Sequence, residues 1–383
     1  MKKLKAAVVG LGIGHAHCAA YLESPQVELA AVCDVWPERL KHVGATFEQG
    51  SMRELENLYP AGLCARRWQD IGVRTTQCLN DLLTDPEIGL VSLCTPDHLH
   101  VEQACRVLAA GKHLLLEKPL ALDTDGAEAV GRAAAESGKT FSVDYEFRLN
   151  PAVLRLRELV SGGFTGEVEA LSLYHFRTPF KRDKYRHWIQ HRKYSGGLIV
   201  EETSHWLDLI RHISGLEVET LTCRSAAGIH ADFDYEDIAY LQGDFTGGGI
   251  WQISHSLSGF DFSLNICVHG RRGTAWCALK EGPRSLLDAG GTSYCGIVSW
   301  GRAGAPADQV ETLTYGEEAT EPFTIKAYAR HFASCAAEGS KPRVSFRDAR
   351  RALELSLAAR RAAETKDTVK PAALDNAARK ETQ

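Results

Sequence analysis

Long apolar runs and paired cysteines are both missing from this 383-residue sequence. No stretch reaches the roughly 18 uninterrupted apolar residues of a membrane-spanning helix, which argues against a transmembrane protein. The 11 cysteines are scattered, with no Cys-x-x-Cys pair and no zinc-finger spacing. Dispersed thiols in apolar surroundings, such as Val32-Cys33 and Leu93-Cys94, are typical of a reducing compartment. We therefore expect a soluble, cytoplasmic protein.

A strong excess of either charge is also missing. Lys and Arg number 44 against 49 for Asp and Glu, a net charge of −5, which argues against nucleic acid or an anionic membrane as a partner. Repeats and low-complexity segments are absent as well. Hydrophobic residues make up 44% of the chain, enough for a full core, and the length is typical of two domains. We place the domains at residues 1–146 and 147–383.

The N-terminus combines a basic start, Met1 to Lys5, with an apolar run that follows it. This order also occurs in secretory signal peptides. Glycines at positions 10, 12 and 14 interrupt the apolar run, however, and histidines follow it. A buried strand followed by a glycine turn accounts for the whole segment, and we prefer that interpretation.

Short β-rich runs alternate with helical patterns through the first third of the chain. Near-continuous apolar strands separated by helices are typical of a parallel sheet covered on both faces, and right-handed crossovers make that sheet doubly wound, as in a Rossmann fold. Residues 45–72 are longer than a simple crossover and predict an insertion over the sheet edge or the mouth of a cofactor site. The predicted strands are 6–9, 28–33, 90–94, 112–116 and 140–143, and the predicted helices are 15–24, 37–44, 98–110 and 123–137.

The pattern changes after about residue 147. Strand-like runs now follow one another with only glycine turns between them, which favours antiparallel pairing. The predicted fold class is therefore α/β, with a Rossmann domain followed by an α+β domain that contains a large, mostly antiparallel open sheet. The predicted strands here are 167–175, 218–225, 237–245, 248–258 and 262–269, and the predicted helices are 152–161, 202–213, 324–337 and 346–364.

A glycine-rich turn, Gly10-Leu11-Gly12-Ile13-Gly14, joins the first strand to the first helix. Glycines permit a tight turn and a close approach of the backbone to a pyrophosphate, which rests on the helix N-terminus. The third glycine comes one residue early, and a plain strand–helix turn is the alternative. If a dinucleotide binds, its pyrophosphate should lie over Leu11 to Gly14, with His15 and His17 near the cofactor and away from bulk water.

Asp34 ends the second strand, downstream of the glycine turn. A carboxylate in this position accepts hydrogen bonds from the adenosine ribose hydroxyls and repels a 2′-phosphate, which favours NAD over NADP. Arg39 is close enough along the chain to leave NADP open. Asp34 could also cap a helix that begins near Pro37, and the two roles can coexist.

Two further motifs follow strands of the same sheet, at the strand ends where open α/β folds bind ligands. The first is Thr95-Pro96-Asp97-His98-Leu99-His100. Its two histidines could bind a metal, but no third ligand stands at a fixed spacing, so we predict no metal site. The second is Glu117-Lys118-Pro119. A partly desolvated lysine can donate to a substrate hydroxyl, and a structural ion pair is the alternative.

A polar segment of the second domain runs from Glu201 to Asp208. If residues 201–212 form one helix, Glu201, His205 and Asp208 share a face at i, i+4 and i+7. A carboxylate one turn from an imidazole sets the tautomer of the ring and makes it a competent base at neutral pH. A solvent-facing polar stripe is the alternative.

A basic and aromatic segment, residues 180–193, lies just upstream. Basic residues interleaved with aromatics could hold a sugar ring and an anionic group, and a basic surface loop is the alternative. We take Trp188 and Arg192 from this segment as candidate substrate contacts. Tyr145 and Arg148, at a strand end, are further candidates.

These motifs stand in the order of one known family. The chain resembles the glucose–fructose oxidoreductase / inositol dehydrogenase / rhizopine catabolism family, written Gfo/Idh/MocA, over nearly its whole length. The resemblance implies an N-terminal Rossmann domain and a C-terminal domain whose open sheet commonly builds a homodimer or homotetramer. The matching motifs are Gly10-x-Gly12, Asp34, residues 95–100, Gly111-Lys112-His113, Glu117-Lys118-Pro119, Arg148-Leu149-Asn150-Pro151, and Glu338 to Pro342.

The resemblance also implies roles for individual residues. In the family pattern Asp-x-x-x-His-x-x-Asp, the histidine acts with the lysine of Glu-Lys-Pro, and here Glu201 replaces the first aspartate. We expect Lys118, His205 and Glu201 to be catalytic, with Glu201 orienting His205, and Asp208 to hold a neighbouring hydroxyl. The expected cofactor contacts are Gly10, Leu11, Gly12, Ile13, Gly14, Asp34, Arg39, Thr95, Pro96, His98, His100, Glu117 and Lys118.

The implied activity is NAD-dependent hydride transfer at a hydroxyl-bearing carbon of a sugar, sugar acid or cyclitol. The basic segment hints at an anionic substrate. An NAD-dependent glycoside hydrolase, which oxidises a sugar carbon transiently and then eliminates, is one alternative. A non-catalytic NAD-binding regulator is another, against which Lys118 and His205 argue.

Overall fold

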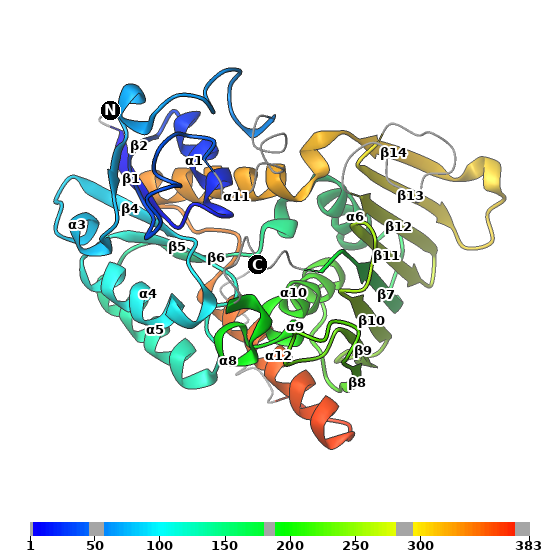
Figure 1. Ribbon diagram of the computed structural model, residues 1–383. Helices are drawn as coiled ribbons and strands as arrows, with labels where there is room; N and C mark the ends of the chain where they lie inside the picture. The colour runs from blue at the N-terminus through cyan, green and yellow to red at the C-terminus, as the bar shows by residue number, and fades with distance from the viewer. Residues whose placement is uncertain (1–2, 46–56, 180–187, 281–293, 372–383) are drawn as a thin grey trace.

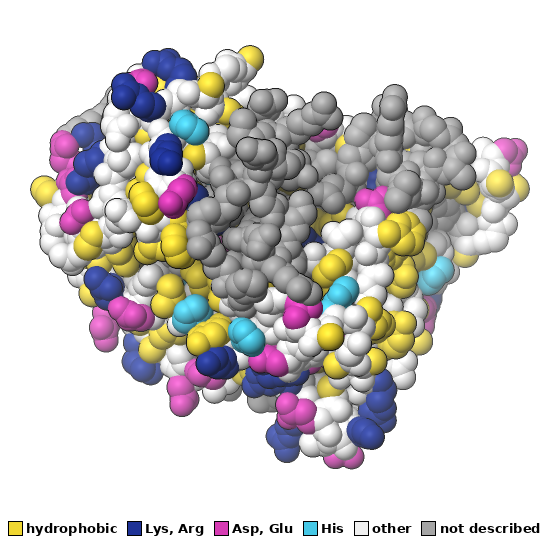
Figure 2. Space-filling view, in the orientation of Figure 1, with side chains coloured by type: hydrophobic (Ala, Val, Ile, Leu, Met, Phe, Trp, Pro, Cys, Tyr) yellow, Lys and Arg dark blue, Asp and Glu magenta, His cyan; other side chains and the backbone are white. Residues whose placement is uncertain are grey.

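Two β-sheets with helices between and around them make up the computed structural model of this chain (Figure 1). The structure describes residues 3–45, 57–179, 188–280 and 294–371. Across these residues, no helix is long and apolar enough to cross a membrane. On the face drawn in Figure 2, basic and acidic side chains are interspersed over the N-terminal half, with no field of one sign.

The first sheet has six parallel strands in the order β3-β2-β1-β4-β5-β6. Its central strands are apolar and buried on both faces, as the near-continuous runs predict. The Rossmann prediction is confirmed, and the order reverses direction between β1 and β4, where such sheets form a crevice for ligands. The strands are β1 (Leu4–Val9), β2 (Val27–Cys33), β3 (Arg74–Thr76), β4 (Ile88–Leu93), β5 (His113–Glu117) and β6 (Phe141–Asp144).

Helices cover both faces of this sheet. Helix α1 packs with α11 on one face, and α4 packs with α5 on the other (Figure 1). The helix predicted at 37–44 is wrong, because this segment forms successive turns. The sequence analysis also missed β3 and the short helix α3. The helices are α1 (Gly14–Leu22), α3 (Leu79–Leu83), α4 (His100–Ala109), α5 (Thr124–Ser137) and α11 (Glu321–Glu338).

The second sheet has eight strands in the order β14-β13-β12-β11-β7-β10-β9-β8. Every neighbouring pair is antiparallel except β7 with β10, so the prediction of a mostly antiparallel sheet is confirmed. The three strands that come last in the chain, β12, β13 and β14, were not predicted from the sequence. The strands are β7 (Val168–Phe176), β8 (Thr222–Ala226), β9 (Ile238–Asp244), β10 (Ile250–Ser256), β11 (Ser263–Gly270), β12 (Gly273–Lys280), β13 (Gly296–Arg302) and β14 (Glu311–Tyr315).

Helices α6 (Pro151–Ser161), α10 (Thr203–Ser214) and α12 (Phe346–Thr365) cover one face of the second sheet (Figure 1). Helix α11 instead returns to the first sheet, where Tyr328 and Phe332 are part of the first core. The two sheets are therefore tied together by the C-terminal part of the chain. The domain boundary near residue 146 stays a prediction.

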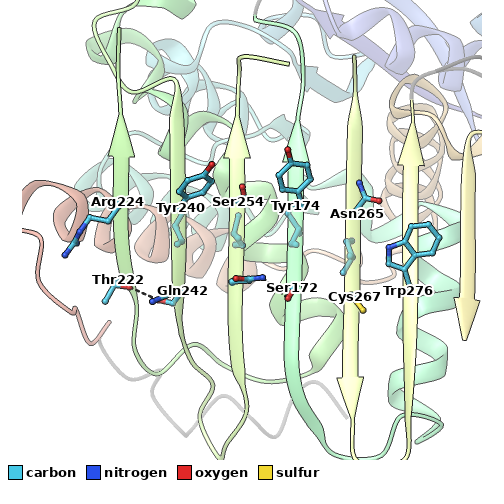
Figure 3. A pocket seen from close by; sticks show the side chains of 15 residues that line it. Ser172, Tyr174, Thr222, Arg224, Tyr240, Gln242, Ser254, Asn265, Cys267 and Trp276 are labelled. Carbon is cyan, nitrogen blue, oxygen red and sulfur yellow. Dashed lines mark hydrogen bonds between the residues drawn. The ribbon is translucent and has the colours of Figure 1, made fainter. Parts of the chain in front are cut away.

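Among the residues that the structure describes, the helices lie on one side of the second sheet and none covers its other face (Figure 1). Its strands alternate buried and exposed residues, as a half-covered antiparallel sheet requires. Tyr174, Tyr240 and Ile250 are about half exposed here, at 48%, 58% and 59%. Tyr174 and Tyr240 line a shallow depression of about 580 Å³, in which polar side chains such as Gln242 and Asn265 lie between aromatic ones (Figure 3).

The described part of the predicted 45–72 insertion packs against helices α1 and α11. The Tyr59 hydroxyl donates to the carbonyl of His15 at 3.0 Å, and Lys326 donates to the carbonyl of Leu58 at 2.8 Å. A short 3-10 turn, Trp68–Ile71, closes the segment before β3. The helical pattern that begins at Met52 lies almost entirely outside the described residues.

Candidate active site

A cavity of about 410 Å³ opens at the carboxyl ends of β1, β2, β4 and β5. Arg177 and Glu201, from the second half of the chain, close its other side. The cavity thus lies where doubly wound sheets bind dinucleotides. The predicted site residues that line it are Gly10, Gly12, Ile13, Asp34, Arg39, Thr95, Pro96, Glu117, Lys118, Trp188 and Glu201.

The glycine turn has one closed and one open side. Gly10 has φ +89°, and a Cβ there would stand 2.1 Å from the carbonyl oxygen of Cys94, so the turn is pressed against the end of β4. A Cβ on Gly12 would meet nothing nearer than the Arg39 guanidinium at 3.9 Å. Helix α1 begins at Gly14 without a side-chain cap. The amides of His15 and Ala16 donate to the carbonyls of Gly12 and Ile13, at 3.5 and 3.0 Å, so the positive end of the helix faces the turn with few other partners. These features fit a pyrophosphate.

Asp34 is buried at the cavity wall and holds its neighbours in place. Its Oδ2 accepts from the amide of Leu11 at 2.8 Å and from Arg39 at 3.2 Å, and its Oδ1 accepts from the amide of Trp36 at 2.9 Å. Asp34 therefore caps a turn instead of the predicted helix. Each carboxylate oxygen can accept a further bond, so a ribose hydroxyl can still be held here.

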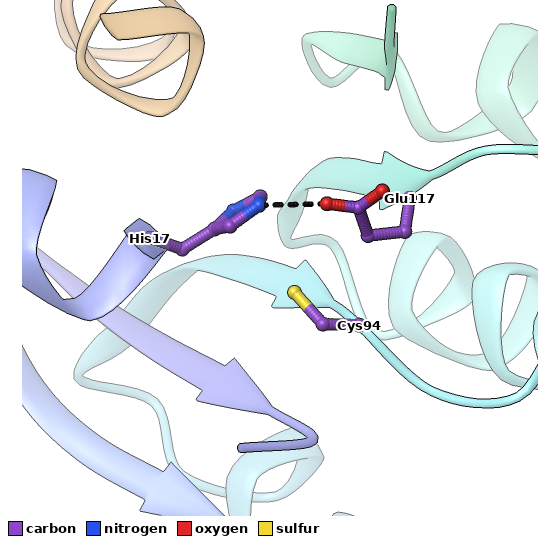
Figure 4. A group of neighbouring side chains, drawn as sticks. All are labelled: His17, Cys94 and Glu117. Atoms are coloured by element: carbon purple, nitrogen blue, oxygen red, sulfur yellow. Dashed lines mark hydrogen bonds and ion pairs between the residues drawn. The ribbon is translucent and has the colours of Figure 1, made fainter. Parts of the chain in front are cut away.

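His15 and His17 are both shielded from water, at 1% and 0% exposed, as expected. His17 contacts the Ser92 hydroxyl through Nδ1 at 3.1 Å and Glu117 through Nε2 at 3.0 Å (Figure 4). The nearby Cys94 thiol has a pKa raised well above its usual value by burial and then by Glu117, so it stays protonated. His17 thus supports Glu117 from behind the cavity.

The motif at residues 95–100 shapes the cavity through its backbone. His100 is fully buried, and its ring lies 2.7 Å from the carbonyl of Pro119 and 2.9 Å from that of Thr95. His98 faces Tyr194, with ring centroids 4.9 Å apart. Neither histidine lines the cavity, so their direct contact with a cofactor stays a prediction. His100 ties the two strand-end motifs together.

Lys118 and Glu201 form an ion pair at the floor of the cavity. Lys118 also donates to the backbone carbonyl of Glu201 at 3.0 Å. Burial lowers the pKa of the Lys118 ammonium, but the charges of Glu201, Glu202 and Asp97 raise it more, so the net shift is upward. The lysine therefore carries a proton that it can share in a hydrogen bond.

The single helix predicted over 201–212 is wrong. Helix α9 (Leu198–Glu201) ends at Glu201, and α10 starts at Thr203. The carbonyl of Glu201 bonds to Lys118 and to the Ser204 hydroxyl, and side-chain donors of this kind compete with the helical pattern. Glu201 consequently points to the lysine, and the expectation that it orients His205 is not met.

His205 lies among aromatic rings, with its centroid 5.5 Å from that of Tyr145 and 5.6 Å from that of Phe147. The carboxylate nearest its Nδ1 belongs to Glu146, at 3.6 Å. Burial, followed by the positive charge of Lys118, lowers the pKa of His205 well below its usual value. The imidazole is therefore neutral, and it does not itself line the cavity.

Arg148 and Asp208 are neutralised by each other. Arg148 donates to both carboxylate oxygens of Asp208, at 2.7 and 2.6 Å, and contacts Asp348 at 3.2 Å. Both members are buried and neither lines the cavity. In this structure the two groups join η3 (Glu146–Leu149), α10 and α12, and their contact with a substrate stays a prediction. Tyr145 is likewise buried beside His205.

Of the basic segment, Trp188 lines the cavity and Arg192 does not. Arg192 pairs with Glu236, and its amide donates to Asp234 at 2.6 Å, so it anchors a loop. Residues 180–187 lie outside the described residues.

Four residues of the site were not among the candidates taken from the sequence. Three of them line the cavity, Asp97, Arg177 and Glu321, and the fourth, Glu146, lies beside His205. Burial, and then Glu201, raises the pKa of Asp97 well above its usual value. Position directly after a strand was a usable signal for Asp97 and Glu146. No pattern in the sequence indicates that Arg177 or Glu321 returns to the first sheet.

Known proteins resemble this chain in both sequence and fold. The scyllo-inositol 2-dehydrogenase (NAD(+)) of Bacillus subtilis is 24% identical over 366 residues, 93% of each chain. The 2,7-anhydro-N-acetylneuraminate hydratase of Escherichia coli is 25% identical over 231 residues, 58% of this chain and 61% of that protein. A levoglucosan dehydrogenase in complex with NADH has a TM-score of 0.77 at 19% identity, over 97% of this chain and 100% of that one.

Two family models match successive parts of the chain. Residues 4–145 match the oxidoreductase family with an NAD-binding Rossmann fold, and residues 153–276 match the GFO/IDH/MocA C-terminal domain. Together these matches cover the first sheet and the second sheet as far as β12, while β13 and β14 lie beyond them. This protein therefore belongs to the Gfo/Idh/MocA family of oxidoreductases.

Proposed function

We propose that this protein is an NAD-dependent oxidoreductase that acts on a hydroxyl-bearing carbon of a sugar, sugar acid or cyclitol. The observation that carries the proposal is the protonated Lys118 in a cavity formed by a dinucleotide-type glycine turn and the second domain. The relatives named for inositol and levoglucosan oxidation support this substrate class.

The proposed chemistry assigns one task to each residue. Lys118 donates a hydrogen bond to the substrate hydroxyl and stabilises the negative charge that develops on that oxygen. Neutral His205 takes the hydroxyl proton. The Glu146 carboxyl lies 3.6 Å from its Nδ1, and burial raises the pKa of that carboxyl well above its usual value, so it is neutral before the proton is transferred. NAD, when bound, supplies a nicotinamide ring that accepts the hydride from the same carbon, which becomes a carbonyl.

The proposed cofactor preference is for NAD over NADP. A 2′-phosphate would meet a like charge in the Asp34 carboxylate, which the backbone amides of Leu11 and Trp36 hold in place at the cavity wall beside Arg39. We expect kcat/KM with NAD to exceed that with NADP. The proposed partner is a second copy or three further copies of this chain, and the proposed location is the cytoplasm.

The test compares Lys118→Ala and His205→Ala with the exposed control variant Lys139→Ala. NADH formation at 340 nm is followed with a panel of sugars, sugar acids and cyclitols, and dinucleotide binding is measured separately by fluorescence. We expect both active-site variants to bind NAD and to lose at least about 100-fold in kcat, while the control is unchanged. Wild-type turnover in either variant would refute the assignment.

A redox-neutral reaction is a second candidate, because one relative is a hydratase by name. In that case an NAD-loaded protein would release an aglycone or rearrange an anhydro sugar without accumulating NADH. Product formation at constant absorbance at 340 nm would favour it over net oxidation.

A further inference from the structure

Two histidines and one glutamate meet in the core of the second half of the chain. His175 on β7 and His255 on β10 are directly paired across parallel strands, and Glu202 stands in the break between α9 and α10. All three are buried, at 0%, 0% and 3% exposed. One ligand atom from each lies within 4.8 Å of the others.

The hydrogen bonds of the two rings fix which nitrogen faces the cluster. His175 Nδ1 lies 3.0 Å from the carbonyl of Ser263, and a carbonyl only accepts, so Nδ1 carries a hydrogen. The Thr203 hydroxyl donates to the carbonyl of Leu198 at 3.2 Å and therefore accepts from His255 Nδ1 at 2.9 Å. In the neutral rings, both Nε2 lone pairs are left for the cluster.

These lone pairs converge on the glutamate. His175 Nε2 lies 3.2 Å and His255 Nε2 lies 4.0 Å from Oε1 of Glu202. His255 Nε2 and Glu202 Oε2 are buried and have no hydrogen-bond partner among the described residues. Three lone-pair donors facing one another repel unless a cation lies between them. Ligands of a tetrahedral zinc ion stand roughly 3.3 Å apart, given bonds of about 2.0–2.2 Å.

We propose that His175, Glu202 and His255 bind one divalent transition-metal ion of the Zn²⁺ type. Two imidazoles and the Glu202 carboxylate, whose Oε2 has no hydrogen-bond partner among the described residues, would supply three ligands and leave the fourth position of a tetrahedral ion open. The anchored Nδ1–H groups provide the outer support that metal-bound histidines usually have. This site departs from the sequence prediction, which assigned no metal.

The surroundings suggest what the ion would do. The Trp206 and Phe262 rings lie against His175, with centroids 4.5 and 5.0 Å away, so the site is shielded by apolar groups. None of the three ligands lines the cavity, and Glu202 directly follows Glu201, the partner of Lys118. The ion would therefore join both strands to the α9–α10 break and position Glu201.

Arg177 opposes metal binding. Its Nη1 donates to Glu202 Oε1 at 3.1 Å, and its charge competes with that of the ion. Arg177 is partly exposed, at 23% for its side chain, so it can turn toward the cavity. Removing the charge in Arg177→Gln should raise the affinity for Zn²⁺ by about tenfold, since a nearby like charge is removed.

The experiment titrates Zn²⁺ into chelator-treated protein, with calorimetry as the readout. We expect one equivalent to bind to the wild type, and affinity to fall by about 100-fold or more in Glu202→Gln and His255→Gln. His230→Asn, a histidine of the same domain outside the cluster, should bind as the wild type does. Co²⁺ should give the visible absorption of a tetrahedral site in the wild type and not in Glu202→Gln.

The competing outcome is a proton in place of the ion. His175 would then be an imidazolium that bonds to Ser263 and Glu202, and NMR would show both ring nitrogens of His175 protonated. The proposal fails if the wild type binds no Zn²⁺ tightly, or if Glu202→Gln and His255→Gln bind it unchanged. A wild type that binds no Zn²⁺ overturns the proposal without any variant, and the two variants assign a bound ion to this cluster. The result is independent of turnover.

Discussion

At the residue scale, Glu201 decides how Lys118 is presented to the cavity. The carboxylate and the backbone carbonyl of Glu201 both accept from the lysine, so they fix the direction of its ammonium group. We expect Glu201→Gln to lower kcat by about 10- to 100-fold, because the lysine loses its charged anchor. The dissociation constant for the dinucleotide should stay the same.

The variant Glu201→Asp supplies the control for this prediction. It restores the carboxylate and should recover most of the lost kcat, in steady-state assays with the best substrate of the panel. Equal loss in Glu201→Asp and Glu201→Gln, or a loss confined to KM, would show that Glu201 acts by shape or in binding alone.

Asp348 makes the folded chain sensitive to acid. Burial alone would raise the pKa of this carboxyl, but Arg148 and the bonds from Ser345 lower it more, to about 2, from 3.8. A depressed folded-state pKa contributes stability above pH 4 that is lost as the pH falls from about 4 to 2. The size is about 2 kcal/mol, at 1.36 kcal/mol per pKa unit.

Urea unfolding at pH 7 and pH 3 measures this contribution. Asp348→Asn should be less stable than the wild type at pH 7, and the difference should shrink at pH 3. Asp85→Asn is the control, since Asp85 lies on the surface of the first sheet and pairs only with an exposed arginine. If the difference in unfolding free energy between the wild type and Asp348→Asn persists at pH 3, the loss of stability comes from packing and not from the charge.

At the scale of elements, two glycines of the glycine turn have different tasks. We expect Gly10 to be needed for stability and Gly12 for binding of the ligand. Gly10→Ala forces a Cβ into the carbonyl of Cys94 at a positive φ, and we expect a loss of about 2–4 kcal/mol in unfolding free energy. Gly12→Ala meets no protein atom within 3.8 Å and should change stability by less than about 1 kcal/mol.

The affinity for the dinucleotide should show the opposite pattern, with the effect in Gly12→Ala. Gly12→Ala places a methyl group where the backbone must approach the pyrophosphate, so NAD binding should weaken by about tenfold or more. Thermal unfolding and NAD titration of both variants check the pair. Unchanged NAD affinity in Gly12→Ala would show that the pyrophosphate does not bind at this turn.

Elements with strong local patterns were predictable from the sequence, and those without them were not. The five long strands of the first sheet and helices α4, α5 and α12 follow from apolar runs and capping residues. Strand β3 has only three residues and takes its place from pairing with β2. The break at Glu202 has no local signal, because it depends on Lys118, which is distant in the sequence.

At the scale of the whole molecule, the uncovered face of the second sheet is where we expect a second copy of this chain. Tyr174, Tyr240 and Ile250 keep apolar surface in contact with water (Figure 3), which a self-complementary contact would remove. Tyr240→Lys combined with Ile250→Lys should reduce the mass measured by light scattering to that of one chain. Ile229→Lys, an equally exposed apolar position elsewhere, is the control and should leave the mass unchanged.

The sequence by itself determined the two sheets, the glycine turn, Asp34, and Lys118 together with the segment from Glu201 to Asp208 as the place to look for chemistry. These features rest on local periodicity and on the rule that parallel strands align their carboxyl ends. The tertiary structure decided which groups meet: Glu146 beside His205, Glu201 on Lys118, Arg148 on Asp208, and His175 with His255 around Glu202. Contacts of this kind depend on strand register and helix breaks, which join positions far apart in the chain and leave no periodic trace in the sequence.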